Sequence, residues 1–263
     1  MVAIVAASVV FSSCDKDSGT NVDSEINIKM VESLDIFPRT LLLHCSTTKI
    51  YPCLDYSIYV TCQQSSKNID ISFKGVSEPP GICRTQPWPA TTVIDLGTLS
   101  NGTYLINIDN GDVKVKGNLI VSSDSYTVNV VNKSSLSFIN TPLNKIPEHT
   151  IWGIIGYHEQ GTSSLVQSFL TACKNLGATK GTYTPGYYND RAGHAFEIDK
   201  NGDINYPDAA LGYRFVQLFI FHYSENITDI EQLVRKYARD YGEHISITVN
   251  TDKGEEFLSF WYQ

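Results

Sequence analysis

Residues 103–121 have the sequence TYLINIDNGDVKVKGNLIV, which predicts the fold class of the first half of the chain. Apolar residues occupy every second position from Tyr104 to Ile108, the period of a strand with one buried face. A second β-rich run follows, and Asn110-Gly111 lies between the two runs. Because an Asn-Gly pair tolerates the positive φ angles of a tight turn, the stretch predicts a β-hairpin.

The same alternation recurs on the N-terminal side of this hairpin. Short strands at such spacing over residues 26–140 are typical of an antiparallel sandwich of immunoglobulin-like type, and we expect about seven or eight of them. Nothing in this half has helical periodicity. The other alternating positions are Tyr56, Ile58, Val60 and Cys62 in one run and Ile69, Ile71 and Phe73 in another.

Two prolines, Pro142 and Pro147, interrupt the pattern, so we place a linker at residues 141–149. Beyond it we expect a second domain, residues 150–263, in which strands alternate with two helices. This order suits an α+β sandwich with both helices on one face of an antiparallel sheet, and a ferredoxin-like arrangement is the first expectation. The expected strands are residues 151–157, 214–221, 245–250 and 257–262.

Capping residues indicate where the two helices begin. The first helix has Ser163 or Ser164 as its cap and stops at Gly177. The second begins at Thr228-x-x-Glu231, the pattern of a capping box.

The N-terminus has the pattern of a lipoprotein signal. Residues 1–10, MVAIVAASVV, are uncharged, and FSSC follows at residues 11–14. This apolar run falls short of the roughly 20 residues that a membrane-spanning helix needs. We predict a signal at residues 1–13, lipidation at Cys14 and a polar tether at residues 14–25, with a buried N-terminal element as the alternative. Because no Lys or Arg precedes the run, we expect the natural start to lie upstream.

The combination of FSSC with DKD at residues 15–17 is similar to the N-terminus of Bacteroidetes envelope lipoproteins. In that group, a Lys and acidic residues just after the lipidated cysteine mark export to the cell surface. The resemblance implies attachment to the outer membrane, facing either the periplasm or the outside. It implies nothing about activity.

Composition excludes some classes of partner. The chain has 263 residues, 42% of them hydrophobic, which is enough for two ordinary cores. The net charge is −8, and Lys and Arg form no cluster. Because affinity for a phosphate backbone comes from positive charge, we do not expect nucleic acid as a partner.

Five cysteines remain if Cys14 carries a lipid, and four of them lie in the first half. Their spacing contains no C-x2-C knuckle, so a disulfide is favoured over a zinc site, with three pairings open. Cys53 begins a strand and Cys83 lies in a proline-rich loop, and we predict a bridge between them. Cys45 and Cys62 either pair with each other or remain thiols.

Other polar clusters favour structural explanations, and we expect no metal, cofactor or catalytic residue. Asp199-Lys200-Asn201-Gly202-Asp203 has oxygen ligands at alternating positions, but its glycine is misplaced for a calcium loop, so we predict a hairpin turn. Cys173 lies on the apolar stripe of a helix and is expected to be buried. The histidines have no H-E-x-x-H spacing, and Ser163 lacks the second glycine of a nucleophile elbow.

The loop of residues 181–194 is the densest group of side chains suited to recognition. Rigid aromatic side chains with polar tips bind protein and sugar surfaces, although the same tyrosines would also complete a sheet core. The binding candidates are Tyr183, Tyr187, Tyr188, Arg191 and His194.

These patterns together predict a non-enzymatic, membrane-anchored envelope lipoprotein. Its C-terminal domain is expected to bind a protein or a glycan, with the sandwich as a stalk. The alternative is a hydrolase or other enzyme with its site in the C-terminal domain. That site would be a deep pocket where Asp190, Arg191, His194 or His222 converge.

Overall fold

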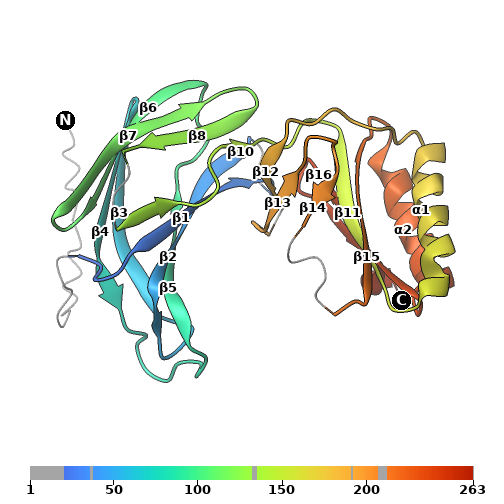
Figure 1. Cartoon of the computed structure of the whole chain (residues 1–263), viewed down its shortest axis with the longest axis horizontal. Helices are drawn as coiled ribbons and strands as arrows, with labels where there is room; N and C mark the ends of the chain where they lie inside the picture. Colours follow the sequence, from blue (N-terminus) through green and yellow to red (C-terminus); the bar gives the residue numbers. More distant parts are fainter. Residues whose placement is uncertain (1–20, 36–37, 132–134, 191, 207–211, 263) are drawn as a thin grey trace, which may run out of the picture.

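The computed structural model describes residues 21–35, 38–131, 135–190, 192–206 and 212–262. The described part of the chain is mostly β, with 49% of its residues in strands and 14% in helices. Figure 1 shows the first half of the chain as a large β structure at one end of the molecule and both helices at the other end.

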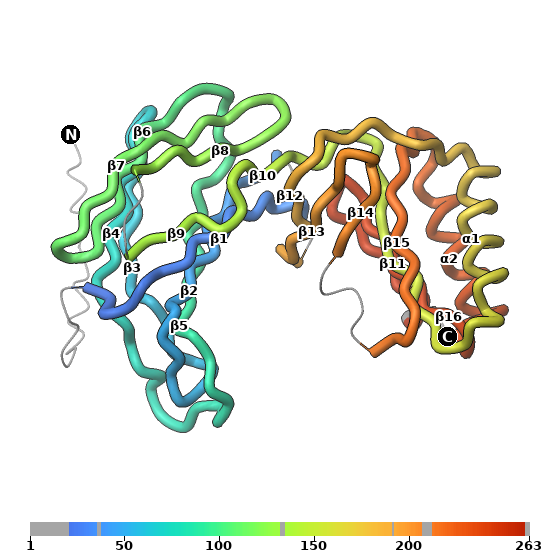
Figure 2. The backbone as a smooth tube through the Cα atoms, viewed as in Figure 1, coloured from blue at the N-terminus to red at the C-terminus, as the bar shows by residue number. Residues whose placement is uncertain are grey.

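Thirteen strands form one sheet, which folds into a sandwich-like structure that Figure 2 traces along the chain. The strands from the first half are β1 (Ile26–Ser33), β2 (Thr40–Tyr51), β3 (Ser57–Ser65), β4 (Asn68–Ser77), β5 (Trp88–Asp95), β6 (Gly102–Asn110), β7 (Val113–Val121), β8 (Ser125–Val130), β9 (Leu136–Phe138) and β10 (Leu143–Asn144). The second half adds β12 (Gly186–Asn189), β13 (Ala195–Ile198) and β14 (Ile204–Asn205). The order is β14-β13-β12-β10-β8-β7-β6-β4-β3-β5-β2-β1-β9.

The strand pattern predicted from alternation is confirmed. Inward-facing residues of β1 to β8 form a single hydrophobic cluster, which includes Ile28, Ile71 and Ile106. Each is at most 1% exposed. In the described part of the chain, no helix precedes residue 160.

The hairpin of β6 and β7 is confirmed, but its turn is shifted by one residue. Asn110 pairs with Val113, so the turn residues are Gly111, with a φ of 65°, and Asp112. Asn110 is buried, and its side-chain amide accepts from the backbone N–H of Val22 and donates to the Val22 carbonyl. Asn110 therefore holds the incoming N-terminal segment instead of forming the turn.

A second sheet has four strands in the order β15-β11-β16-β17, with every neighbouring pair antiparallel. Helices α1 and α2 cover one face of it (Figure 1). The expected strand at residues 257–262 ends at Leu258, where a 3-10 turn begins. The elements are β11 (Thr150–Tyr157), η1 (Gln160–Thr162), α1 (Ser163–Asn175), β15 (Phe215–His222), α2 (Ile227–Tyr241), β16 (Ile245–Thr251), β17 (Glu256–Leu258) and η2 (Ser259–Tyr262).

Both helices exist, but the predicted caps are wrong. The 3-10 turn η1 runs directly into α1, so Ser163 is already helical, and Thr162 at the cap position makes no side-chain cap bond. At α2 the cap is Asn226, whose side chain accepts from the Thr228 N–H at 3.2 Å. Glu231, which was expected to take part in a capping box, instead forms an ion pair with Arg235.

Residues 141–149, expected to be a linker, are part of the fold. Within them, β10 pairs with β8 on one side and with β12 on the other. Ile146 joins a third hydrophobic cluster with Leu34 from the first half and Trp152, Tyr188 and Phe196 from the second. The two halves therefore share a small core.

Two buried asparagines supply hydrogen-bond partners for the part of β1 that β9 does not reach. Strand β9 pairs with β1 only as far as Ile28. Beyond that point, the amide of Asn140 bonds both backbone groups of Met30, at 2.8 and 2.7 Å. The amide of Asn189 does the same for Glu32, at 2.8 Å each. Side-chain amides thus take the place of a neighbouring strand and tie the second half to β1.

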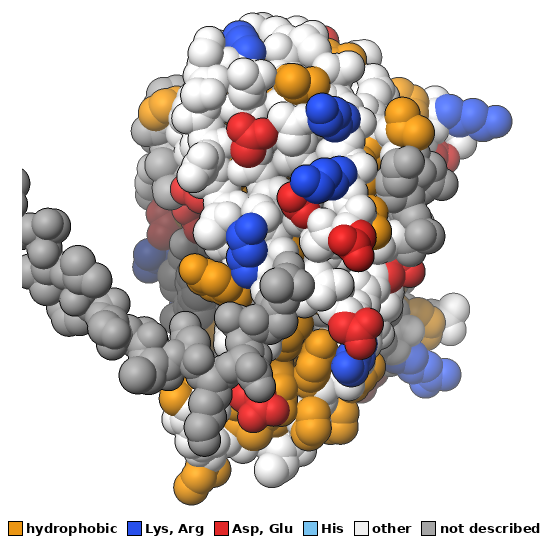
Figure 3. Space-filling model, turned by 90° about the vertical axis from the view of Figure 1, so that its left-hand side faces the viewer, with side chains coloured by type: hydrophobic (Ala, Val, Ile, Leu, Met, Phe, Trp, Pro, Cys, Tyr) orange, Lys and Arg blue, Asp and Glu red, His pale blue; other side chains and the backbone are white. Residues whose placement is uncertain are grey.

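Figure 3 shows the face of the sandwich that points away from the helices. Charged side chains of both signs are interspersed over it, and hydrophobic side chains gather at its lower end. Neither described helix is both long and apolar enough to cross a bilayer.

Candidate functional site

A cleft of about 770 Å³ lies where the two halves meet. Residues before β2, the turn between β7 and β8, and residues 145–149 line one side. Thr182, Thr184 and the turn between β16 and β17 line the other. Its volume is in the range of sites that hold small molecules. Most side chains that line it are polar or charged, among them Arg39, Asp124, Lys145, His149, Thr182 and Lys253.

Arg39 holds the wall of this cleft together. Its guanidinium donates to Glu32 Oε2 at 3.1 Å and to the backbone carbonyls of Ile146 and Asp252, both at 2.7 Å. The acceptors come from β1, from the segment that joins the halves, and from the turn after β16. Because one planar cation satisfies all three, it fixes their relative positions.

Gly254 allows that turn to approach the first half. Its φ is 78°, and a Cβ there would lie 2.2 Å from the Leu34 carbonyl oxygen. Any larger residue would therefore push Asp252 away from Arg39.

Glu32 is a buried carboxylate, 2% exposed, at the base of the cleft. Burial raises its pKa, and this effect outweighs the opposing influence of the Arg39 charge. The Tyr126 hydroxyl donates to Glu32 Oε1 at 3.4 Å, and burial raises the tyrosine pKa as well. These groups are already paired, so they form the structural floor of the cleft.

Lys145 and His149 form the rim. The Lys145 ammonium lies 4.6 Å from the centre of the Tyr126 ring and donates to the Ser122 carbonyl at 2.7 Å, while burial lowers its pKa. His149 has a φ of 61°, a conformation that few residues other than glycine adopt. Strained backbone of this kind is often found at binding sites.

Several lining side chains remain open to a ligand. Within the described residues, the side chains of Thr182, Lys253 and Asp124 make no hydrogen bond to another residue of the chain. They offer a hydroxyl, a cation and a carboxylate around one cavity. Such mixed donors and acceptors suit a ligand with many hydroxyl groups.

The structure removes part of the tyrosine-rich surface expected from the sequence. Tyr188 is 1% exposed, stacks on Phe196 at 5.5 Å between ring centres, and donates to the Thr184 carbonyl. Tyr183 is half-buried against the same cluster. For these two residues the sheet-core interpretation holds, because β12 packs between β10 and β13 and places Tyr188 inside.

The other loop candidates are more accessible. Tyr187 is 41% exposed, and Arg191 lies outside the described residues. His194 is exposed, and its Nδ1 lies 3.1 Å from Oδ2 of the buried Asp190, which also accepts from the Tyr206 hydroxyl. This pairing orients the imidazole. In the described part of the chain, no hydroxyl or thiol is bonded to its other ring nitrogen.

His222 does not join Asp190 and His194. It lies edge-on to His149, 5.8 Å between ring centres, at the end of β15. The convergence of these residues in a deep pocket, expected for an enzyme, is therefore not found among the described residues. Those residues also contain no group of three or more His, Cys, Asp or Glu side chains placed to hold a metal.

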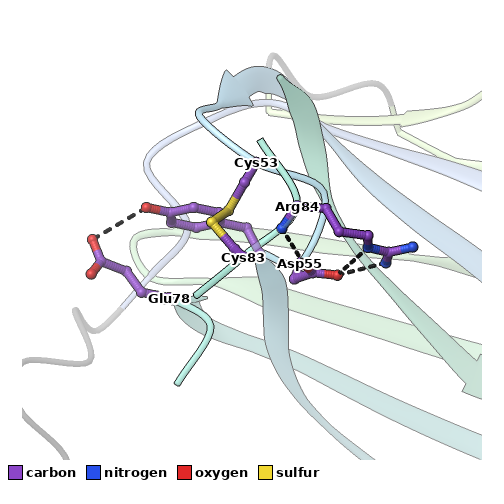
Figure 4. The surroundings of a disulfide bond; sticks show 6 residues. Cys53, Asp55, Glu78, Cys83 and Arg84 are labelled. Carbon is purple, nitrogen blue, oxygen red and sulfur yellow. Dashed lines mark hydrogen bonds and ion pairs between the residues drawn. A yellow bond between two sulfur atoms is a disulfide. The ribbon is translucent and has the colours of Figure 1, made fainter. Parts of the chain in front are cut away.

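The predicted disulfide is confirmed. Cys53 and Cys83 are bonded, with their Cα atoms 6.1 Å apart, and Figure 4 shows Asp55 and Arg84 paired beside them. Cys45 and Cys62 are free thiols, which decides between the two alternatives left open. Cys14 lies outside the described residues.

Two other structural predictions are confirmed. Cys173 is a free, fully buried thiol, and burial raises its pKa to about 12. Asp199 accepts from the backbone N–H groups of Asp203 and Asn201 in the turn between β13 and β14, and these bonds lower its pKa. Its carboxylate therefore serves the hairpin turn.

The sequence did contain one signal for the cleft that was missed. Ile26, Ile28 and Met30 occupy every second position of β1 and face the core, and Glu32 continues this series. A carboxylate at an inward position of a strand needs a buried partner. The partners themselves follow no motif, since Asp252 is 213 residues from Arg39.

Comparison with protein-family models, curated proteins and solved structures finds no match to this chain.

Proposed function

We propose that this protein is a membrane-tethered, non-enzymatic binding protein of the cell envelope, and that it holds a glycan in the cleft between its two halves. The observation that carries the proposal is the cleft itself. Its floor charges are paired, while the lining side chains of Thr182, Lys253 and Asp124 make no hydrogen bond within the described residues. Of the two ligand classes expected from the sequence, a glycan suits a concave polar site better than a protein surface does.

The cleft also changes where binding is expected. Thr182, Thr184 and Lys253 belong to the second half, whereas Arg39 and Asp124 belong to the first. Binding is therefore proposed to need both halves, not the C-terminal half alone.

The finer description of the fold is also a proposal. We infer an immunoglobulin-like sandwich followed by a variant of the ferredoxin-like arrangement. The support is the strand order β16-β11-β15, next to which Thr179 forms a bridge with His222. In a βαββαβ chain, the second strand lies at this edge of the sheet, beside the third strand. Here the second strand would be reduced to the single bridge at Thr179, and β17 would be an added strand at the opposite edge.

Cys14→Ala is expected to move the protein from the membrane fraction to the soluble fraction in its native host. The reason is that a lipid on Cys14 would be the main attachment to the bilayer. Cell fractionation measures the change. A variant that stays as tightly bound as the parent would refute the lipid tether.

Thr182→Val combined with Lys253→Met is expected to weaken glycan binding at least about tenfold, because each lost hydrogen bond contributes about 1 kcal/mol. Binding is screened on a glycan array and measured by calorimetry. The matched control is Thr61→Val with Lys236→Met, which makes the same chemical changes at exposed sites on β3 and α2, outside the cleft lining. Equal affinity of both double variants would remove the cleft from consideration.

A further inference from the structure

A rigid apolar tip closes one end of the sandwich. It consists of residues 50–56, the last two residues of β2 and the loop to β3, and residues 79–89, the loop after β4 and the first two residues of β5. The Cys53–Cys83 disulfide joins the two segments, and Arg84 donates to both carboxylate oxygens of Asp55, at 2.6 and 3.0 Å (Figure 4). Five of its residues are prolines. These constraints hold the side chains of the tip in place.

The tip exposes large hydrophobic side chains. Ile82 is fully exposed, Ile50 is 57% exposed and Trp88 is 46% exposed. Behind them the rings of Tyr51 and Tyr56 stack at 4.7 Å. Hydrophobic side chains gather at the lower end of the face in Figure 3, the end at which the tip lies. Trp88 shares a sheet face with its β2 partner Tyr51, and Ile50 points to the opposite face, so the tip presents apolar side chains on both faces. Large exposed apolar side chains gathered at one end of a sheet mark a site of interaction with a membrane or a partner.

The N-terminal segment enters the fold at this same end. The Lys49 N–H donates to Ser24 Oγ at 3.0 Å, and Lys49 is only two residues before Tyr51. Asn21 lies against Gly111, in the turn between β6 and β7. Cys14 precedes Asn21 by seven residues, so even a fully extended chain places a lipid on Cys14 within about 25 Å of Asn21.

The charges at the tip favour a neutral interface. Its two charged residues, Arg84 and Asp55, form an ion pair, and Lys49, Glu78 and Asp23 flank it with charges of both signs. Such a surface has no electrostatic preference for anionic headgroups. Tryptophan and tyrosine, in contrast, are enriched at the boundary between headgroups and hydrocarbon.

We propose that the tip inserts its exposed apolar side chains into the surface of the bilayer that carries the lipid anchor. This inference rests on the tether of the proposed function. Arg39 directly precedes β2 and the tip begins near its end at Ile50, so the eleven-residue step along the strand holds the cleft roughly 35 Å from the bilayer.

The test uses the unlipidated chain from Asp15 to Gln263, which keeps every described residue, and sucrose-loaded phosphatidylcholine vesicles. Co-sedimentation is expected, with a partition coefficient at least about tenfold lower for Ile82→Ser combined with Trp88→Ser. The control Leu105→Ser removes a side chain about as exposed as Trp88 from β6, toward the opposite end of the sandwich, and is expected to change partitioning less than twofold. Circular dichroism checks that the variants are folded.

Two further readouts separate insertion from other kinds of binding. In a Trp261→Phe background, brominated lipid is expected to quench tryptophan emission, and adding Trp88→Phe is expected to abolish this quenching, since the remaining Trp152 is buried. Raising the salt concentration is expected to leave partitioning unchanged. Equal sedimentation of the parent and the tip variant, or no quenching, would overturn the proposal. Because no lipid on Cys14 is present, this result is independent of the fractionation test.

Discussion

Replacing Arg39 with methionine is expected to lower the free energy of unfolding by about 3–5 kcal/mol. The change leaves the buried Glu32 carboxylate without its cation and the carbonyls of Ile146 and Asp252 without their donor. Urea denaturation measures the effect. The control Arg235→Met breaks an exposed pair with Glu231 on α2 and is expected to cost only about 0.3–0.5 kcal/mol.

A second variant and the pH dependence identify the cause of this loss. Glu32→Gln combined with Arg39→Met removes both charges and is expected to recover part of the stability. Burial raises the pKa of Glu32 in the folded state, and the loss of Arg39 raises it further. When a carboxyl group has a higher pKa in the folded state than in the unfolded state, the free energy of unfolding falls as the pH rises from the unfolded pKa through the folded pKa. The deficit of Arg39→Met should therefore shrink as pH falls toward 4.5, the ordinary value for Glu.

A deficit that is the same at all pH values would mean that the buried charge of Glu32 is not its cause. A deficit below about 1 kcal/mol would contradict the role of Arg39 as the group that joins the two halves.

Removing the disulfide is expected to have the second largest effect. Cys53→Ser combined with Cys83→Ser frees a loop whose ends are 30 residues apart, which costs roughly 3–4 kcal/mol in the chain-entropy description. The control is Cys62→Ser at a free, half-buried thiol, with an expected change below about 1 kcal/mol. Denaturant midpoints give the comparison, and a double variant as stable as the control would contradict the prediction.

Local patterns in the sequence were sufficient for much of the first half. Alternation of apolar and polar residues predicts strands because successive side chains of a strand point to opposite faces of the sheet. The hairpin of β6 and β7 follows from Gly111. The bridge of Cys53 to Cys83 was predicted, although Cys53 lies in the loop between β2 and β3 and does not begin a strand. What failed were assignments that depend on one residue of register, such as Asn110 in the turn and Ser163 as a cap.

The junction of the two halves could not be derived in the same way. Its contacts join Glu32 and Arg39 to Asn189 and Asp252, which are more than 150 residues away along the chain. The two prolines predicted a free linker because proline disrupts regular strands, yet Leu143 between them pairs on both sides. For the same reason the sequence left two explanations of the tyrosine loop open, because whether Tyr188 faces solvent depends on which strand packs over it.

The most direct test of the proposed function is hydrogen exchange measured with and without a glycan identified on the array. If the cleft binds the glycan, protection should appear at residues 145–149, 182–184 and 252–253, with contributions from both halves of the chain. Protection confined to the exposed Tyr187 and His194 side of the loop, or to the apolar tip, would contradict the account. So would the absence of any change in exchange at a glycan concentration that saturates the protein.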